Sequence, residues 1–189
     1  PLKVVYAGTI GRAQQLSNAL YAMDIARQRG VDISLKLLGD GAAKAALEKL
    51  ADELGVDAKF EGKAGPERLC ECYQWADTAL VHLAEWEPLK RAVPSKTYEL
   101  MEAGMHITAV VQGETADIIL ENCAGIVVEP GRPDLLASAW ESLAREPSLL
   151  SVGNEPKEWV RKERKENVPA ELFATLVGVK EGSSNDKTS

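Results

Sequence analysis

Short apolar runs and longer helical patterns alternate along most of this chain. The apolar or β-branched runs lie at 3–8, 34–39, 58–60, 78–83, 106–111 and 125–130. Between them, apolar residues recur at helical spacing over 14–29, 42–54, 66–76, 95–103, 114–121 and 134–145. Strands separated by helices of this length are typical of right-handed βαβ units, and nearly all-apolar strands are typical of a sheet covered on both faces. The pattern predicts a Rossmann-like, three-layer α/β domain with a parallel sheet of about six strands.

Glycine and proline mark several boundaries of these elements. Gly30 and Gly55 stand where a C′ glycine would end the first and second helices. Gly65 and Pro66 open the third helix, with proline in a first-turn position. These signals support the element boundaries predicted from the apolar pattern.

The C-terminal part of the chain has a different character. After Pro147 the strand pattern stops, and 156–178 supplies two further helical stretches. The last residues, "EGSSNDKTS", are small and polar, which is typical of a disordered tail. We therefore expect one domain over 1–180, ending in C-terminal helices, and a disordered tail over 181–189.

The charge balance argues against a nucleic-acid partner. The chain has 29 acidic and 22 basic residues and a net charge of −7, so it lacks the basic excess that would neutralise phosphates. The stretch "KEWVRKERKE" (157–166) holds the basic residues Lys157, Arg161, Lys162, Arg164 and Lys165, interleaved with glutamates. That mixture favours a solvated helix face over a binding patch, with at most a modest attraction to an anionic surface.

Cysteine usage and the chain ends suggest a cytoplasmic setting. Cys70, Cys72 and Cys123 are odd in number and form no metal-ligand or disulfide framework, which fits a reducing cytosol. No apolar run approaches the roughly 18 residues that a membrane span needs. The chain opens directly on a strand-like run without a signal peptide. Because it starts with proline at the edge of that strand, we expect a domain whose N-terminal partner is missing.

Candidate chemistry lies in the loops that follow the strands. In open α/β sheets, ligands bind beyond the carboxyl ends of the strands. Gly8 and Gly11 in the first loop, and Gly39 and Gly41 in the second, would let the backbone approach a ligand closely. Each loop precedes a helix N-terminus, where free N–H groups and the helix dipole favour a phosphate. These loops are "AGTIGRAQ" (7–14), "LGDGAAK" (38–44) and "AEWEPLKRAVPS" (84–95).

The stretch "VPSKTYELMEAG" allows two interpretations. Ser95 is predicted at the N-cap or first position of a helix, so its hydroxyl and neighbouring amides can meet a diphosphate together with Lys96. Glu99, one turn further along, is acceptor-only when ionised and can accept from both hydroxyls of a ribose. In the alternative, Ser95 only caps the helix, Lys96 is solvated and Glu99 pairs with a neighbour. Spacing does not decide between them.

Other polar residues give weaker signals. His106 begins a strand and is predicted to be structural, whereas His82 ends one and either faces the cleft or is buried. Trp86 lies in the longest loop, where it either stacks on a ligand or fills the loop. The sequence has no H-E-x-x-H or D-x-D motif, so we expect no metal.

Taken in order, several motifs resemble a known family. The segments "VVYAGTIGRAQ", "LLGDGAAKAALEKLADELGV" and "PSKTYELMEAG…ITAVVQGE…AGIVVEPG" resemble the C-terminal, donor-binding domain of GT-B glycosyltransferases of family 4, also called group 1. The likeness covers about residues 3–145, and the final helices resemble the family's ending. The "PSK" segment is the most specific part of it.

The resemblance implies a set of donor-binding residues. The turn from Gly8 to Gly11 would face the diphosphate, Ser95 and Lys96 would hold phosphate, and Glu99 would bind ribose. Backbone atoms around Glu61 would border the base. The full predicted set is Gly8, Thr9, Gly11, Arg12, Gly39, Glu61, Gly62, Lys63, Pro94, Ser95, Lys96 and Glu99.

One departure from the family pattern affects the sugar site. Glu99 would match the second glutamate of the E-x7-E motif, but the first glutamate position is occupied by Arg91. The family's usual sugar contacts therefore do not transfer to this chain. Arg12 and Lys96 remain as candidate stabilisers of the leaving group, and other catalytic residues are not identified in this domain.

The implied function is the donor-binding half of a retaining glycosyltransferase. The expected donor is a UDP-sugar without metal, and the expected acceptor is a polysaccharide, lipopolysaccharide or lipid-linked glycan at the inner face of the membrane. The acceptor site would belong to the missing N-terminal domain of the enzyme. This chain alone should therefore bind a nucleotide and transfer almost nothing.

Three alternatives use the same fold differently. A nucleotide-sugar 2-epimerase shares the GT-B fold and the diphosphate loops. An NAD(P)-binding module should carry G-x-G-x-x-G at the first helix, but "GTIGRA" has G-x-x-G, and Asp40 comes after a glycine rather than at the strand end. A non-catalytic interaction domain would have no nucleotide affinity.

Overall fold

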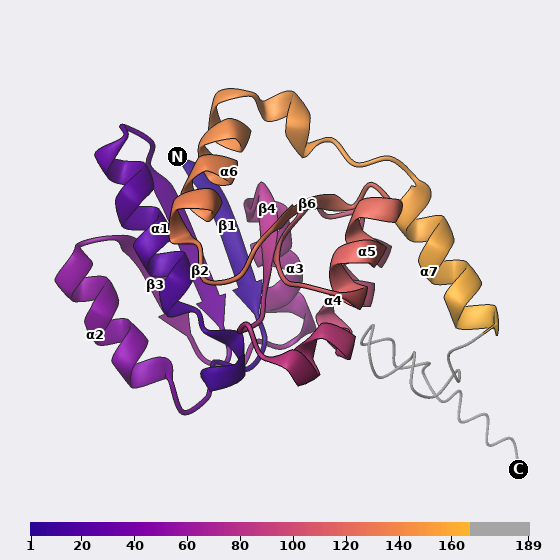
Figure 1. Ribbon diagram of the computed structural model, residues 1–189, viewed down its shortest axis with the longest axis horizontal. Helices are drawn as coiled ribbons and strands as arrows, with labels where there is room; N and C mark the ends of the chain where they lie inside the picture. Colours follow the sequence, from indigo (N-terminus) through magenta and orange to yellow (C-terminus); the bar gives the residue numbers. More distant parts are fainter. Residues whose placement is uncertain (167–189) are drawn as a thin grey trace, which may run out of the picture.

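The core of the protein is one parallel sheet with the strand order β3-β2-β1-β4-β5-β6 (Figure 1). The computed structural model describes residues 1–166 of the 189. The strands are β1 (Leu2–Ala7), β2 (Ile33–Leu38), β3 (Asp57–Glu61), β4 (Thr78–His82), β5 (Ile107–Val110) and β6 (Gly125–Val128). All six predicted strands are confirmed, with ends that differ by one or two residues.

The helices follow the predicted alternation. They are α1 (Ser17–Gln28), α2 (Lys44–Leu54), α3 (Pro66–Trp75), α4 (Ser95–Glu102), α5 (Glu114–Glu121), α6 (Pro133–Arg145) and α7 (Glu155–Glu166). Short 3-10 turns lie at η1 (Arg12–Gln14), η2 (Glu87–Arg91) and η3 (Pro147–Leu150). The helix α7 confirms the first predicted C-terminal stretch, whereas the second stretch and the predicted tail over 181–189 lie outside the described residues.

The first helix begins later than its apolar pattern predicts. The pattern places its start at residue 14, but α1 begins at Ser17. Gln15 ends the preceding 3-10 turn in the left-handed conformation, with φ of 46° and ψ of 48°. A residue in this conformation cannot continue a right-handed helix. The turn therefore separates the glycine-rich loop from α1.

Helices cover both faces of the sheet and give two separate apolar cores (Figure 1). Side chains alternate across a strand, so Val4 and Tyr6 of β1 enter one core and Val5 enters the other. The first core lies under α1, α2 and α6 and includes the fully buried Trp140. The second lies under α3, α4, α5 and α7. This is the three-layer arrangement that the nearly all-apolar strands predict.

The helix α7 packs chiefly on α4. Trp159 of α7 stacks on Tyr98 of α4, with ring centroids 5.8 Å apart and planes inclined by 14°. Val160, the next residue, is fully buried in the second core. The charged residues of the 157–166 stretch therefore belong to an amphipathic helix whose apolar side is occupied by α4.

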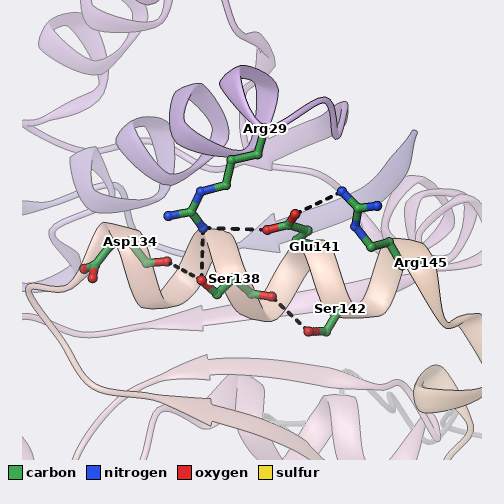
Figure 2. Close-up of polar contacts among 6 residues, drawn as sticks. All are labelled: Arg29, Asp134, Ser138, Glu141, Ser142 and Arg145. Carbon is green, nitrogen blue, oxygen red and sulfur yellow. Dashed lines mark hydrogen bonds and ion pairs between the residues drawn. The ribbon is translucent and has the colours of Figure 1, made fainter.

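A polar network joins α1 to α6 above the first core (Figure 2). Arg29 donates to the Ser138 hydroxyl at 3.0 Å and lies 3.6 Å from a Glu141 oxygen, and Arg145 donates to the other Glu141 oxygen at 3.0 Å. Exposed pairs of this kind contribute about 1 kcal/mol or less. The apolar contacts beneath therefore carry most of the stability of this interface.

His106 is buried beside two threonines at the start of β5. Thr78 Oγ1 lies 2.8 Å from His106 Nδ1 and 2.9 Å from the hydroxyl of Thr108. Burial lowers the pKa of His106 to about 4, so the ring is neutral near pH 7. The predicted structural role of His106 agrees with this position.

The lowered pKa of His106 makes stability dependent on acid pH. Unfolded histidine titrates near pH 6.5, so between pH 6.5 and 4 the unfolded chain binds the proton that the folded chain excludes. We expect wild type to lose about 2 kcal/mol more than His106→Gln in free energy of unfolding between pH 7 and 4.5. Urea unfolding of both proteins at the two pH values measures this difference. Equal losses would contradict a neutral, buried His106.

Candidate functional site

Two adjoining hollows lie at the carboxyl ends of the central strands. They occupy about 270 and 260 Å³ and share Ala7, Gly8, Thr9 and Lys96. The strand order reverses at β1, because β2 follows on one side and β4 on the other. A reversal of this kind opens a crevice at the strand ends in open α/β sheets.

Each hollow extends over a different part of the sheet. The first lies toward β2 and α3, and its other lining residues are Leu38, Gly39, Asp40, Lys63, Ala64 and Leu69. The second lies toward β4 and α4, and its other lining residues are Tyr6, Gln14, Leu80, Val81, His82, Leu83, Pro94 and Ser95. Seven of the predicted residues line the hollows: Gly8, Thr9, Gly39, Lys63, Pro94, Ser95 and Lys96.

The loops after β1 and β2 press directly against each other. The amide of Gly8 donates to the Leu38 carbonyl at 3.0 Å, and the amide of Ile10 donates to the Asp40 carbonyl at 3.0 Å. A Cβ on Gly39 would lie 1.9 Å from the Gly8 carbonyl oxygen, and Gly39 has φ of +152°. Glycine is required at this position by contact and by backbone conformation.

The first loop has an internal hydrogen bond at Gly11. Gly11 ends the turn that is predicted to face the diphosphate, and its amide donates to Gln14 Oε1 at 3.0 Å. Arg12 is exposed in η1 and does not line either hollow. The loop therefore offers the hollows the backbone of Gly8 and Thr9, while Gly11 and Arg12 lie outside.

The helix α4 directs its N-terminus at the second hollow. Pro94 is the N-cap and Ser95 is the first helical residue, without a side-chain capping bond. The first N–H groups of a helix have no partner within it, and they carry the positive end of the dipole. Because Pro94, Ser95 and Lys96 all line the hollow, this end of α4 supplies a local field that favours an anion there.

Lys96 and Glu99 form an ion pair at the edge of the hollow. Lys96 Nζ lies 2.6 Å from Glu99 Oε2, and the two side chains are 28% and 19% exposed. Glu99 is therefore paired with a neighbour, as one of the two interpretations expects, and Lys96 is not simply solvated. Lys96 lines both hollows, whereas Glu99 lines neither and meets their edge through its contact with Lys96.

Tyr73 is a neighbour of this pair that the sequence did not indicate. Its hydroxyl, on α3, lies 3.4 Å from Glu99 Oε1. Burial first, and the Glu99 charge second, raise the pKa of Tyr73 above its usual range. They are 26 positions apart in the sequence, a separation that carries no spacing signal, so only the fold brings Tyr73 of α3 to Glu99 of α4.

Glu61 turns its carboxylate away from the first hollow. Arg68 donates to both oxygens of that carboxylate, at 2.9 and 2.6 Å, and this contact lowers the pKa of Glu61. The Glu61 carbonyl accepts from the Gly39 amide at 3.1 Å. Gly62 and Glu61 do not line the hollow, whereas Lys63 does. The segment after β3 therefore borders the hollow chiefly through Lys63 and Ala64.

His82 lines the second hollow but is only 2% exposed. Its Nε2 lies 3.0 Å from the Asn18 amide nitrogen, and burial lowers its pKa to about 4. Since the amide can only donate, Nε2 accepts and Nδ1 carries the proton of a neutral ring. His82 is thus a buried, uncharged residue in the wall of the second hollow.

Residues 84–93 of the long loop before α4 line neither hollow. Trp86 is 51% exposed, so it does not fill the loop, and Arg91 is exposed in η2. Within the described residues, no group of three or more His, Cys, Asp or Glu side chains is placed to hold a metal ion. No helix among them has the length and apolar character required to cross a bilayer.

A family model for group 1 glycosyl transferases matches residues 1–166. The chain belongs to the group 1 glycosyltransferase family. The resemblance found in the sequence is thereby confirmed, and the match continues through α7. No curated protein matches the sequence.

Solved structures of glycosyltransferases share the fold of this group 1 domain. The catalytic domain of cholesterol-alpha-glucosyltransferase from Helicobacter pylori is 19% identical, with a TM-score of 0.66, 86% of this chain covered and 98% of that one. The C-terminal domain of LpcC, a group 1 protein from Francisella tularensis, is 18% identical, with a TM-score of 0.68 and coverages of 88% and 87%.

Longer structures match this group 1 domain over part of their length. Anabaena Alr3699/HepE, solved with UDP and glucose, is 14% identical, with a TM-score of 0.67. The match covers 94% of this chain but 46% of HepE. The chain therefore matches about half the length of that protein.

The Gly8–Gly39 contact gives a sharp test of the site geometry. Gly39→Ala places a methyl group against the Gly8 carbonyl and strains the backbone, so we expect a loss of about 2–4 kcal/mol in free energy of unfolding. Gly65→Ala is the control, since its Cβ would meet nothing within 4 Å. It should cost about 1 kcal/mol or less as a helix N-cap change. Urea unfolding of both variants measures the difference, and equal losses would contradict the contact.

Proposed function

We propose that this chain is the donor-binding half of a retaining glycosyltransferase that uses a nucleoside diphosphate sugar. The observation that carries the proposal is the pair of hollows at the strand ends. There the backbone of Gly8 and Thr9, the tip of α4 and Lys96 lie around one space. Backbone that a ligand can approach closely, a helix N-terminus and one ammonium group together suit a diphosphate.

The two hollows divide the donor between them in this proposal. The diphosphate lies over Gly8 and Thr9, beside the N-terminus of α4. The base enters the first hollow, between Gly39 and Lys63, and the ribose lies within reach of Glu99. The second hollow, lined by Ser95, is left for the phosphate that carries the sugar.

Leaving-group stabilisation is the chemical contribution of this domain. Breaking the bond between the sugar and the diphosphate leaves negative charge on the phosphate. Fixed N–H groups at the tip of α4 stabilise that charge without reorganising, and Lys96 adds a full positive charge. Arg12 is exposed beside the glycine-rich loop and would contribute only if the loop or the missing domain brought it closer.

The acceptor site is proposed to lie on a second domain. The chain covers 46% of HepE and 35% of Staphylococcus aureus TarM, which was solved with UDP. A domain of this kind holds one substrate and needs its partner domain to hold the other. The proposed acceptor is a polysaccharide, lipopolysaccharide or lipid-linked glycan. UDP is the expected nucleotide, in keeping with the complexes of these neighbours.

Calorimetric titration with UDP, GDP, ADP and NAD tests the proposal. We expect wild type to prefer one nucleoside diphosphate, and Lys96→Ala and Glu99→Ala each to weaken its binding on the order of tenfold, the effect of losing one hydrogen bond to a charged group. Lys49→Ala is the matched control: it also removes one positive charge, from a side chain on α2 that is 80% exposed. It should leave the affinity unchanged.

Two results would contradict the proposal. NAD binding tighter than that of every diphosphate would indicate a dinucleotide module. Affinity that Lys49→Ala lowers as much as Lys96→Ala would indicate general charge attraction instead of a site.

A further inference from the structure

We infer that Tyr73 is a positioning residue that holds the Glu99 carboxylate in place for the ribose hydroxyls of the donor. The inference rests on the proposed function and names a residue of the same site. Its basis is the arrangement around Glu99, where each carboxylate oxygen has its own partner: Lys96 Nζ at 2.6 Å from Oε2, and the Tyr73 hydroxyl at 3.4 Å from Oε1.

A single partner would leave the carboxylate free to rotate. Glutamate has three side-chain torsions, and fixing them costs conformational entropy on binding. A contact at each oxygen sets the plane of the carboxylate before a ligand arrives. Each oxygen also keeps a further lone pair, so hydroxyls of a ribose can still be accepted. Such preorganisation lowers the cost of binding.

The two partners of Glu99 differ in what else they do. Lys96 lines both hollows and is the ammonium group proposed for the diphosphate. When Lys96 turns toward a phosphate, its contact with Glu99 weakens or breaks. Tyr73 lines neither hollow and has no such second task. It is the partner that can stay on Glu99 while the donor is bound.

The surroundings of Tyr73 hold its hydroxyl in place as a hydrogen-bond donor to Glu99. It is partly buried on α3, where its ring packs against the second core. Burial and the Glu99 charge raise the pKa of its hydroxyl, which therefore keeps its proton at neutral pH and donates to the carboxylate. The contact also joins α3 to α4, the helices that precede and follow β4 in the sequence.

The positioning role of Tyr73 can be tested by comparing the affinities for nucleotides that contain ribose and deoxyribose. The probes are UDP and 2′-deoxy-UDP, with GDP and 2′-deoxy-GDP in parallel, titrated against wild type, Tyr73→Phe and Tyr98→Phe. We expect wild type to prefer the ribonucleotide by about tenfold or more, as for a hydrogen bond to a charged acceptor. Tyr73→Phe should lower that preference severalfold and leave deoxynucleotide affinity nearly unchanged.

Tyr98→Phe is the matched control. Tyr98 lies on α4, one residue before Glu99, and its ring stacks on Trp159. Tyr98 lines neither hollow. The control should keep the full ribose preference. Thermal melting of all three proteins checks that both variants fold as wild type does.

The outcomes separate the inference from the function on which it rests. A ribose preference that survives in Tyr73→Phe overturns the inference and leaves the proposed function standing. An equal fall in ribo- and deoxynucleotide affinity also overturns it, because a merely structural residue would act on both. Failure of wild type to bind either diphosphate overturns the proposed function and the inference with it.

Discussion

The parallel pairing of β1 with both β2 and β4 is the constraint on which the rest of the site depends. In the sheet, β2 lies on one side of β1 and β4 lies on the other. The loops that leave β1 and β4 therefore diverge, and a crevice stays open between them. Gly8 lies at the end of β1, facing the loop of β2 on one side and the tip of α4 on the other. The same pairing buries β1 between the two cores, which holds this backbone rigid.

Electrostatics at this edge is local. The chain carries a net charge of −7, yet the tip of α4 and Lys96 present positive potential to the hollows. Glu99 compensates Lys96 at 2.6 Å, so the site before binding has an ion pair in place of an isolated ammonium group. A diphosphate would have to compete with a carboxylate that is already in contact. The affinity for a diphosphate therefore depends on how Lys96 divides its contacts between the phosphate and Glu99.

The fold could be predicted from the sequence almost completely, because period-2 and helical patterns are local properties. The start of α1 was the main error: nothing in the chemistry of glutamine indicates the left-handed conformation of Gln15. The site could be predicted only in part. Glycines and helix N-termini that follow strand ends can be located from the sequence. Gly8 and Ser95 were predicted at the site in this way.

What could not be predicted was orientation and long-range contact. The three-residue spacing of Lys96 and Glu99 permits both a ligand site and an ion pair, and the structure shows the ion pair. Glu61 was predicted to border the base through backbone atoms, and nothing in the sequence indicated that Arg68, seven residues later, would hold its carboxylate. Tyr73 meets Glu99 only through packing between helices.

The stack of Trp159 on Tyr98 bears on where this domain can be cut. A fragment that stopped after α6 would retain every strand of the sheet and would look complete from its topology. Without α7, however, the side of α4 that α7 covers would be exposed. Tyr98 would lose its stacking partner, and the second core would lose Val160. The smallest unit that retains the native surroundings of the α4 tip therefore extends through α7, so expression boundaries should be chosen by the packing of α4 and not by the last strand.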